Sequence, residues 1–248
     1  MPPFAFSNST PPTYTPQRLD QSVQFLRPRH QVHHHSSYHT NPYPHHHYST
    51  TIAQLPPSPQ ALGIFNNYIA HQSESLVLKE RVLSLSGDSF SIKTLDGREI
   101  LQVKGEAFSL SGRKMVMDMQ GNHIFTIRKE HFSFPKAYYA EDAQGKRFFE
   151  LEGKFSLGSS KSVARFINSF TNQQEELMMK GNFFDTHADI TNVKTGQPVA
   201  RIDRKMLNAK ELFTGQQTYV VTVAQGVDMA LIAAMCICLD EKKNDNKY

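Results

Sequence analysis

The amino-acid sequence predicts a mainly β protein: a closed antiparallel barrel of about twelve short strands around a buried apolar C-terminal helix, preceded by a disordered arm. Three observations predict this fold class. Proline and histidine are concentrated in the first third of the chain, a hairpin pattern recurs through its middle, and a continuous apolar segment lies near the C-terminus.

The first 73 residues have the composition of a disordered arm. They hold 11 of the 13 prolines and nine of the 12 histidines, with few aliphatic side chains. Such a segment cannot bury enough apolar surface to offset the conformational entropy that ordering removes. We therefore expect residues 1–73 to form the arm and residues 74–248 to form one barrel domain.

A turn-and-strand pattern recurs four times after the arm. In each copy a glycine follows a polar residue and opens a run whose fourth and sixth residues are apolar. Glycine suits a tight turn that needs a positive φ angle, and alternation with period two places those apolar side chains on one face. The other face is expected to be wet, as in an antiparallel sheet on a core. The apolar pairs are Leu101 and Val103, Phe125 and Ile127, Phe149 and Leu151, and Ala200 and Ile202, separated by Gln102, Thr126, Glu150 and Arg201.

Residues 227–239 are expected to form a helix that is buried on every side. The segment is apolar apart from Asp228 near its start. At 1.5 Å per residue it reaches about 20 Å, less than the roughly 30 Å of a bilayer core. A closed barrel can surround such a helix completely, whereas a solvated sheet covers only one side. The alternative is a tail anchor that begins near Tyr219 and places Asp228 in the membrane.

The two cysteines, Cys236 and Cys238, lie in this helix. A separation of two residues turns them about 200° apart, so they suit neither a mutual disulfide nor a metal pair. Reduced buried thiols, together with an N-terminus that lacks a signal peptide, favour a cytoplasmic protein. A peripheral position at the membrane and a nuclear location stay open.

Residues 219–241 carry a Tyr-Val-Val-Thr-Val strand, a turn into Gly-Val-Asp, an apolar helix and a closing Leu-Asp-Glu. Together with the segment 100–122, they resemble the LURP-one-related family, whose members look like the C-terminal domains of Tubby proteins and phospholipid scramblases. The resemblance covers about residues 76–243. It implies a twelve-stranded barrel around the C-terminal helix and no catalytic residues. Tubby relatives bind phosphoinositide headgroups through basic side chains on one side of the barrel.

Basic residues stand near the expected strand ends and turns. If they converge on one rim, they form a cationic site for phosphate groups. Adjacent residues of a strand point to opposite faces, so at most one of each Arg-Lys pair can serve one surface. The candidate lipid-binding residues are Lys104, Arg113, Lys114, Arg128, Lys129, Arg204 and Lys205. The sequence thus predicts a non-enzymatic binding module for anionic phospholipid, specifically phosphoinositide, headgroups.

Two further functions stay open: a protein-interaction scaffold without a lipid role, and a scramblase-like protein anchored by its C-terminal segment. The net charge of +4 is too small to predict a nucleic-acid partner. Residues 185–189 hold two carboxylates and an imidazole, but no nucleophile or third metal ligand accompanies them. We therefore expect no enzyme activity, no cofactor and no metal site.

The arm contains one candidate docking motif. Pro11, Pro12 and Tyr14 match the Pro-Pro-x-Tyr ligand of WW domains, in which a preformed polyproline II segment docks on an aromatic groove. The histidine clusters of the arm lack the fixed geometry of a metal site. A WW-domain protein is therefore the partner that the arm predicts.

Overall fold

The computed structural model describes residues 54–79, 89–105, 113–154, 160–181, 187–204 and 218–245. Three expectations fall outside the described residues: the disorder of residues 1–53, the docking motif of Pro11, Pro12 and Tyr14, and the position of Lys205.

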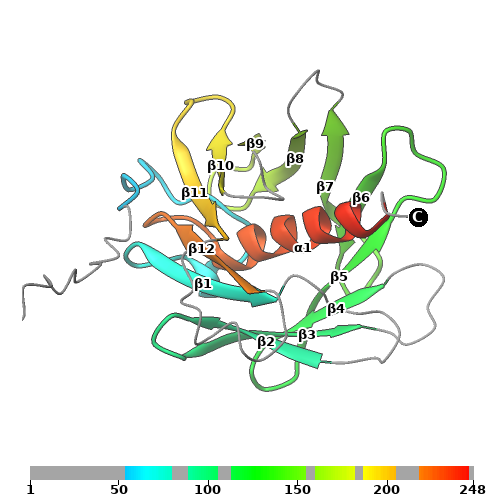
Figure 1. The fold of residues 1–248 in the computed structure, drawn as a ribbon, viewed down its shortest axis with the longest axis horizontal. Coiled ribbons are helices and arrows are strands. Elements are labelled where there is room, and N and C mark those ends of the chain that lie inside the picture. Colours follow the sequence, from blue (N-terminus) through cyan, green and yellow to red (C-terminus); the bar gives the residue numbers. More distant parts are fainter. Residues whose placement is uncertain are drawn as a thin grey trace, which may run out of the picture. The chain divides into compact units, whose positions relative to one another are not determined.

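The described residues form twelve strands, one short 3-10 helix and one α-helix (Figure 1). In chain order they are η1 (Asn66–Tyr68), β1 (Glu74–Lys79), β2 (Ser89–Thr94), β3 (Glu99–Gly105), β4 (Lys114–Met117), β5 (His123–Lys129), β6 (Ala137–Glu141), β7 (Arg147–Lys154), β8 (Ser160–Asn168), β9 (Gln173–Gly181), β10 (His187–Asn192), β11 (Pro198–Asp203), β12 (Thr218–Val223) and α1 (Met229–Asp245).

The twelve strands form a closed barrel. Each strand pairs antiparallel with the next in sequence, and β1 pairs with β12 to close the ring. The helix α1 runs through the middle of this ring (Figure 1). The predicted fold class, a mainly β barrel around a C-terminal helix, is therefore confirmed.

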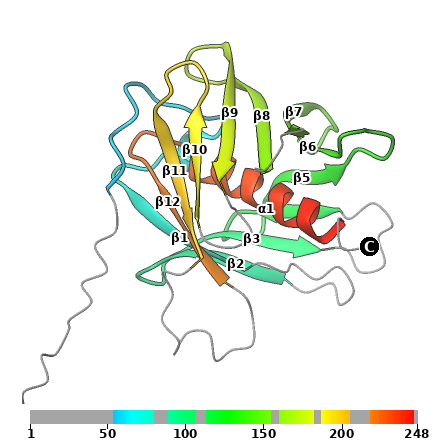
Figure 2. The same cartoon turned by 45° about the horizontal axis from the view of Figure 1, so that its top comes forward.

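The up-and-down topology gives the barrel two different ends (Figure 2). The α1 N-terminal end, where α1 begins, carries the short turns β2–β3, β4–β5, β6–β7, β8–β9 and β10–β11. The α1 C-terminal end, where α1 finishes, carries the connections β1–β2, β3–β4, β5–β6, β7–β8, β9–β10 and β11–β12. Four of these are longer than any turn at the other end, whereas β7–β8 and β9–β10 are as short as those turns.

The predicted hairpin glycines lie in the turns of the α1 N-terminal end. Gly97, Gly121, Gly145 and Gly196 have φ angles of +89°, +84°, +80° and +71°. These are left-handed conformations that glycine adopts without steric cost. Asn172 takes the corresponding place before β9, with φ of +54°. The turn signal in the sequence thus marked these hairpins correctly.

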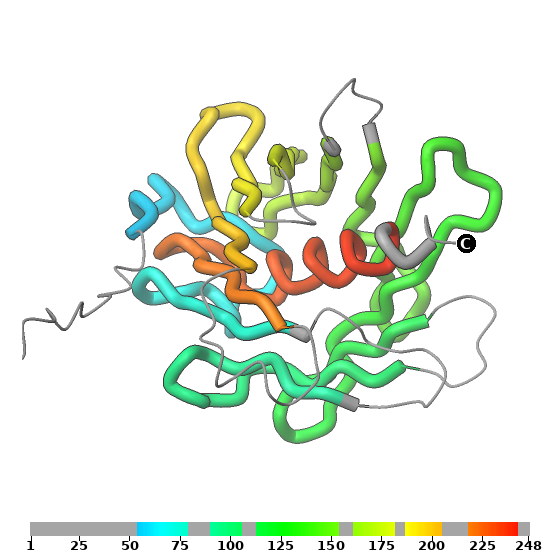
Figure 3. Tube along the Cα trace, viewed as in Figure 1, coloured from blue at the N-terminus to red at the C-terminus, as the bar shows by residue number. Residues whose placement is uncertain are grey.

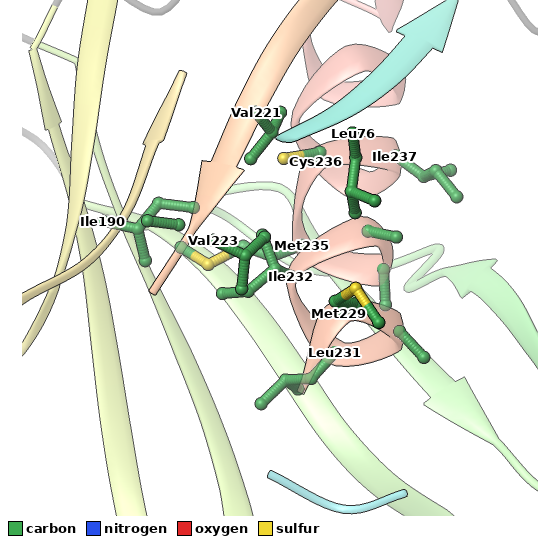
Figure 4. Packing of buried hydrophobic residues seen from close by; sticks show 14 of the residues in the cluster. Leu76, Ile190, Val221, Val223, Met229, Leu231, Ile232, Met235, Cys236 and Ile237 are labelled. Carbon is green, nitrogen blue, oxygen red and sulfur yellow. The ribbon is translucent and has the colours of Figure 1, made fainter. Parts of the chain in front are cut away.

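The apolar positions of the pattern face the barrel interior. All eight predicted inward side chains are no more than 1% exposed. Figure 4 shows Leu76, Val221 and Val223 pointing toward side chains of α1. One outward prediction is wrong: Thr126 is only 2% exposed, and its hydroxyl lies 2.8 Å from the His123 Nε2 atom.

The helix α1 is buried along its first eleven residues, 229–239, as the sequence predicts. Both cysteines in it are free and buried, and burial raises the pKa of each thiol. Within the described part of the chain, no helix combines the length and apolar character needed to cross a membrane.

Residues 54–73 pack against the barrel (blue in Figure 3), although the sequence composition placed them in the arm. Leu55, Leu62 and Ala70 are buried in the core, at 6%, 3% and 1% exposed. Leu62 and Ile69 also form β-bridges to the residues just before α1. The packed structure thus begins before the predicted boundary at residues 73 and 74. Composition did not indicate this, because apolar side chains are spaced sparsely through the segment.

Asp228 joins this N-terminal segment to the helix. Its Oδ1 atom accepts hydrogen bonds from the backbone N–H groups of Ala230 and Leu231, at 2.8 and 3.2 Å, and so caps α1. Its Oδ2 atom accepts from Ile64 and Phe65, at 2.9 and 2.8 Å. The side chain is fully buried, and burial raises its pKa. Asp228 is therefore a structural residue.

Glycine is required where the segment passes Asp228. A Cβ atom at Gly63 would lie 2.1 Å from the Asp228 Cβ atom. Asn168 fixes the same crossing, because its amide donates to the Ala61 carbonyl at 3.1 Å and its Oδ1 accepts from the Gly63 N–H at 3.3 Å. These contacts hold the segment across the α1 N-terminal end.

Candidate functional site

The topology brings the candidate basic residues to one end of the barrel. Strands β3, β5 and β11 finish at the α1 C-terminal end, and β4 begins there. The sequence alone shows strand ends but not which of them meet. The described candidates at this end are Lys104, Arg113, Lys114, Arg128, Lys129 and Arg204.

Lys114 points into the barrel. Its side chain is 1% exposed, and its Nζ atom lies 3.6 Å from a carboxylate oxygen of Glu241 in the last turns of α1. That Nζ atom has no hydrogen-bond partner among the described residues. A cation near the C-terminus of a helix also meets the negative end of the helix dipole. Lys114 therefore balances charge inside the barrel and presents none to a surface ligand.

Arg204 is also used internally. Its Nη2 atom lies 3.4 Å from Asp240 Oδ1, with side chains 9% and 4% exposed, and its guanidinium group stands 4.6 Å from the Tyr219 ring centroid. The Tyr219 hydroxyl donates to Asp240 Oδ2 at 2.6 Å. Burial and the neighbouring carboxylate raise the pKa of Tyr219 well above its usual value. This network holds the end of α1 in the barrel.

The remaining candidates differ in direction and in what surrounds them. Arg128 forms an ion pair with Glu141 at 2.5 Å on the barrel surface. Lys104 is exposed and Arg113 is half-buried, whereas Lys129 is half-buried on the strand face that points inward, opposite the buried Tyr138. Of the predicted set, Lys104 is therefore the lysine best placed to meet a ligand in solution.

The strand register reveals two lysines that sequence reasoning missed. Lys161 of β8 and Lys180 of β9 lie directly opposite each other near the α1 C-terminal end. Lys180 is exposed and Lys161 is half-exposed, whereas the next residue in β8, Ser162, is buried and faces inward. Neither lysine has an ion pair with another described residue. Like charges directly opposite across two strands destabilise a sheet.

The carboxylate next to this lysine pair is already neutralised. Asp189 of β10 lies opposite Lys180 in register, but both of its oxygens bind Arg201, at 2.7 and 3.2 Å. Within the segment 185–189, Asp189 thus serves an ion pair, whereas Asp185 lies outside the described residues. His187 is exposed, and no group of three metal-ligating side chains occurs among the described residues.

These lysines belong to a continuous part of the rim. Around the ring the strands follow the order β5, β6, β7, β8, β9. Lys129 ends β5, Lys136 precedes β6, and Lys161 and Lys180 lie on β8 and β9. We call these four residues the lysine arc. Of the lysine arc, only Lys129 was among the predicted residues. The sequence does not show which strands pair, so it could not bring the other three lysines together.

A barrel of twelve antiparallel strands closed around a C-terminal helix is the Tubby-like class of fold, and its basic end suits a binding or scaffold role. A model of the LURP-one-related family matches residues 74–240. The chain therefore belongs to the LURP-one-related family.

Three Arabidopsis thaliana proteins are similar in sequence. Protein LURP-one-related 15 is 21% identical over 198 residues, covering 77% of this chain and 91% of that protein. Protein LURP-one-related 10 is 22% identical, with coverage of 71% and 93%, and Protein LURP1 is 20% identical, with coverage of 71% and 87%. A solved X-ray structure of an Arabidopsis thaliana protein matches 71% of this chain and 94% of its own, with 18% identity and a TM-score of 0.46.

Proposed function

We propose that this protein is a non-enzymatic module that binds anionic phospholipid headgroups, phosphoinositides in particular, through the lysine arc. The observation that carries the proposal is the pairing of Lys161 with Lys180. Two like charges at directly opposed positions oppose folding, and a bound phosphate group would turn that repulsion into attraction.

The surroundings of the pair support an anionic ligand. Asp189 is occupied by Arg201, and Arg165, four residues along β8 from Lys161, binds Glu152 and Glu176 at 2.8 Å each. These carboxylates are thus engaged by arginines, and none of them forms an ion pair with either lysine. An anionic membrane surface attracts such lysines with about 1 kcal/mol each.

The decisive variant neutralises the pair: Lys161→Gln with Lys180→Gln in the full chain. Co-sedimentation with phosphatidylcholine vesicles that contain a phosphoinositide should weaken roughly thirtyfold at low salt, which corresponds to about 2 kcal/mol. The free energy of unfolding should stay equal or rise by about 0.2–1 kcal/mol, because the repulsion is relieved. A purely structural role for the two lysines predicts the opposite change in stability.

The matched control is Lys146→Gln with Lys194→Gln, which removes the same charge from exposed turns at the α1 N-terminal end. It should leave vesicle binding unchanged. Wild-type protein should bind phosphoinositide vesicles selectively over neutral ones, and physiological salt should reduce that binding. Equal binding to both vesicle types, or none to either, would reject the proposal and favour the protein-interaction scaffold.

A further inference from the structure

The β5–β6 loop, residues 130–136, carries two exposed phenylalanines at the α1 C-terminal end. Phe132 and Phe134 are 101% and 88% exposed. The other large exposed hydrophobics among the described residues are 41–51% exposed and lie in or beside turns of the α1 N-terminal end; they are Leu95, Ile167, Phe170 and Val193. The loop is therefore the most exposed apolar feature of the described surface.

Hydrogen bonds hold the loop in this conformation. The Ser133 hydroxyl donates to the Glu130 carbonyl at 3.3 Å and accepts from the Ala137 N–H at 2.9 Å. The Glu130 N–H donates to the Ala137 carbonyl at 2.9 Å, which closes the base of the loop. Ser133 thus turns inward between two phenylalanines that project outward.

The charge around the loop indicates what covers the two rings. Lys129 precedes the loop and Lys136 is its last residue, and both belong to the lysine arc. The one acidic residue in the loop, Glu130, is paired with Arg147 at 2.8 Å. Apolar side chains between lysines suit the boundary between anionic headgroups and acyl chains, where rings enter the apolar layer and ammonium groups stay at the phosphates.

We propose that Phe132 and Phe134 insert into the interfacial layer of an anionic bilayer when the lysine arc binds its headgroups. This inference rests on the proposed function and adds a second, apolar contribution to membrane binding. A bilayer needs no pocket complementary to the two rings. A stable protein partner would need roughly 800 Å² on each side, and two side chains at a loop tip supply only part of that area.

The absence of tryptophan from the chain allows a direct test. Phe132→Trp in the full-length protein introduces a single tryptophan at the loop tip, whose emission can be excited selectively over that of the tyrosines. With phosphoinositide-containing vesicles its emission should shift to shorter wavelength, and lipids brominated on their acyl chains should quench it. Phe170→Trp, at the opposite end of the barrel, is the matched control and should show neither effect.

A second experiment removes the rings without changing charge. Phe132→Ser with Phe134→Ser should weaken vesicle binding at least about tenfold, while Phe170→Ser with Val193→Ser should not weaken it. The thermal midpoint of the loop variant should match wild type, because both rings are exposed in the folded protein.

The outcomes separate the two proposals. Loss of binding in the Lys161 and Lys180 variant, with normal binding in the loop variant and no spectral shift for the tryptophan, would overturn loop insertion and keep headgroup recognition. Wild-type protein that binds no vesicle would overturn both. A spectral shift that appears only with a protein partner would assign the loop to protein docking and overturn the bilayer proposal.

Discussion

At the scale of single residues, the role of a lysine depends on whether its side chain lies on the inward or the outward face of its strand. Lys114 and Lys161 both lie near strand starts at the α1 C-terminal end. Lys114 shares the inward face with Val116 and meets Glu241, whereas Lys161 faces outward opposite Lys180. A basic residue near a strand end therefore indicates a surface site only when its register is known.

Lys114→Met tests this distinction. Vesicle binding should stay at the wild-type level, because the lysine is 1% exposed. The free energy of unfolding should change by less than about 1 kcal/mol, since methionine fills a similar volume and Glu241 keeps access to water. Urea unfolding measures the second quantity. A loss of vesicle binding as large as that of the Lys161 and Lys180 variant would show that Lys114 contacts the ligand.

Asp228→Ala tests a second buried ionisable residue. The change leaves four N–H groups without their acceptor, two of them buried and two partly buried, so we expect a loss of about 3 kcal/mol in urea unfolding. Asp118→Ala removes a side-chain oxygen that accepts from the backbone N–H groups of Gln120 and Asn122 in an exposed turn, and it should cost clearly less because water can replace that acceptor. Equal losses for the two variants would contradict the role of Asp228 in joining α1 to the N-terminal segment.

At the scale of elements, the sequence predicts structure that depends on neighbouring residues but not structure that depends on tertiary contacts. The hairpins follow from glycine, alternation and turn chemistry, all within a few residues. The packing of residues 54–73 does not, because it depends on backbone bonds to residues 225–227 and on Phe65, which stacks on Phe125 with centroids 5.4 Å apart. The segment has no periodic sequence pattern that predicts these contacts.

Truncation measures what this segment contributes. A chain that begins at residue 73 loses the buried side chains of Leu55 and Leu62 and the Phe65 contact. Compared with a chain that begins at residue 54, it should be less stable by roughly 3–6 kcal/mol, at about 1.5–3 kcal/mol for each buried leucine. Thermal melting of the two chains checks this, and equal midpoints would restore the boundary that composition predicts.

At the scale of the whole barrel, the two ends are specialised. One carries only short turns and the N-terminal segment, and the other carries the four longest connections, the lysine arc and the β5–β6 loop. Barrel closure could be predicted because a helix that is apolar all round must be enclosed. The lysine arc could not, since Lys161 and Lys180 are brought together only by the pairing of β8 with β9.

Hydrogen–deuterium exchange of the full chain, with and without phosphoinositide-containing vesicles, tests most directly whether the α1 C-terminal end meets the membrane. Membrane contact slows amide exchange where it excludes water. Our account predicts slower exchange in residues 129–137 and in the ends of β8 and β9 near Lys161 and Lys180, with the turns at Gly97, Gly145 and Gly196 unchanged. Protection confined to those turns would contradict it, as would an exchange pattern that vesicles do not alter.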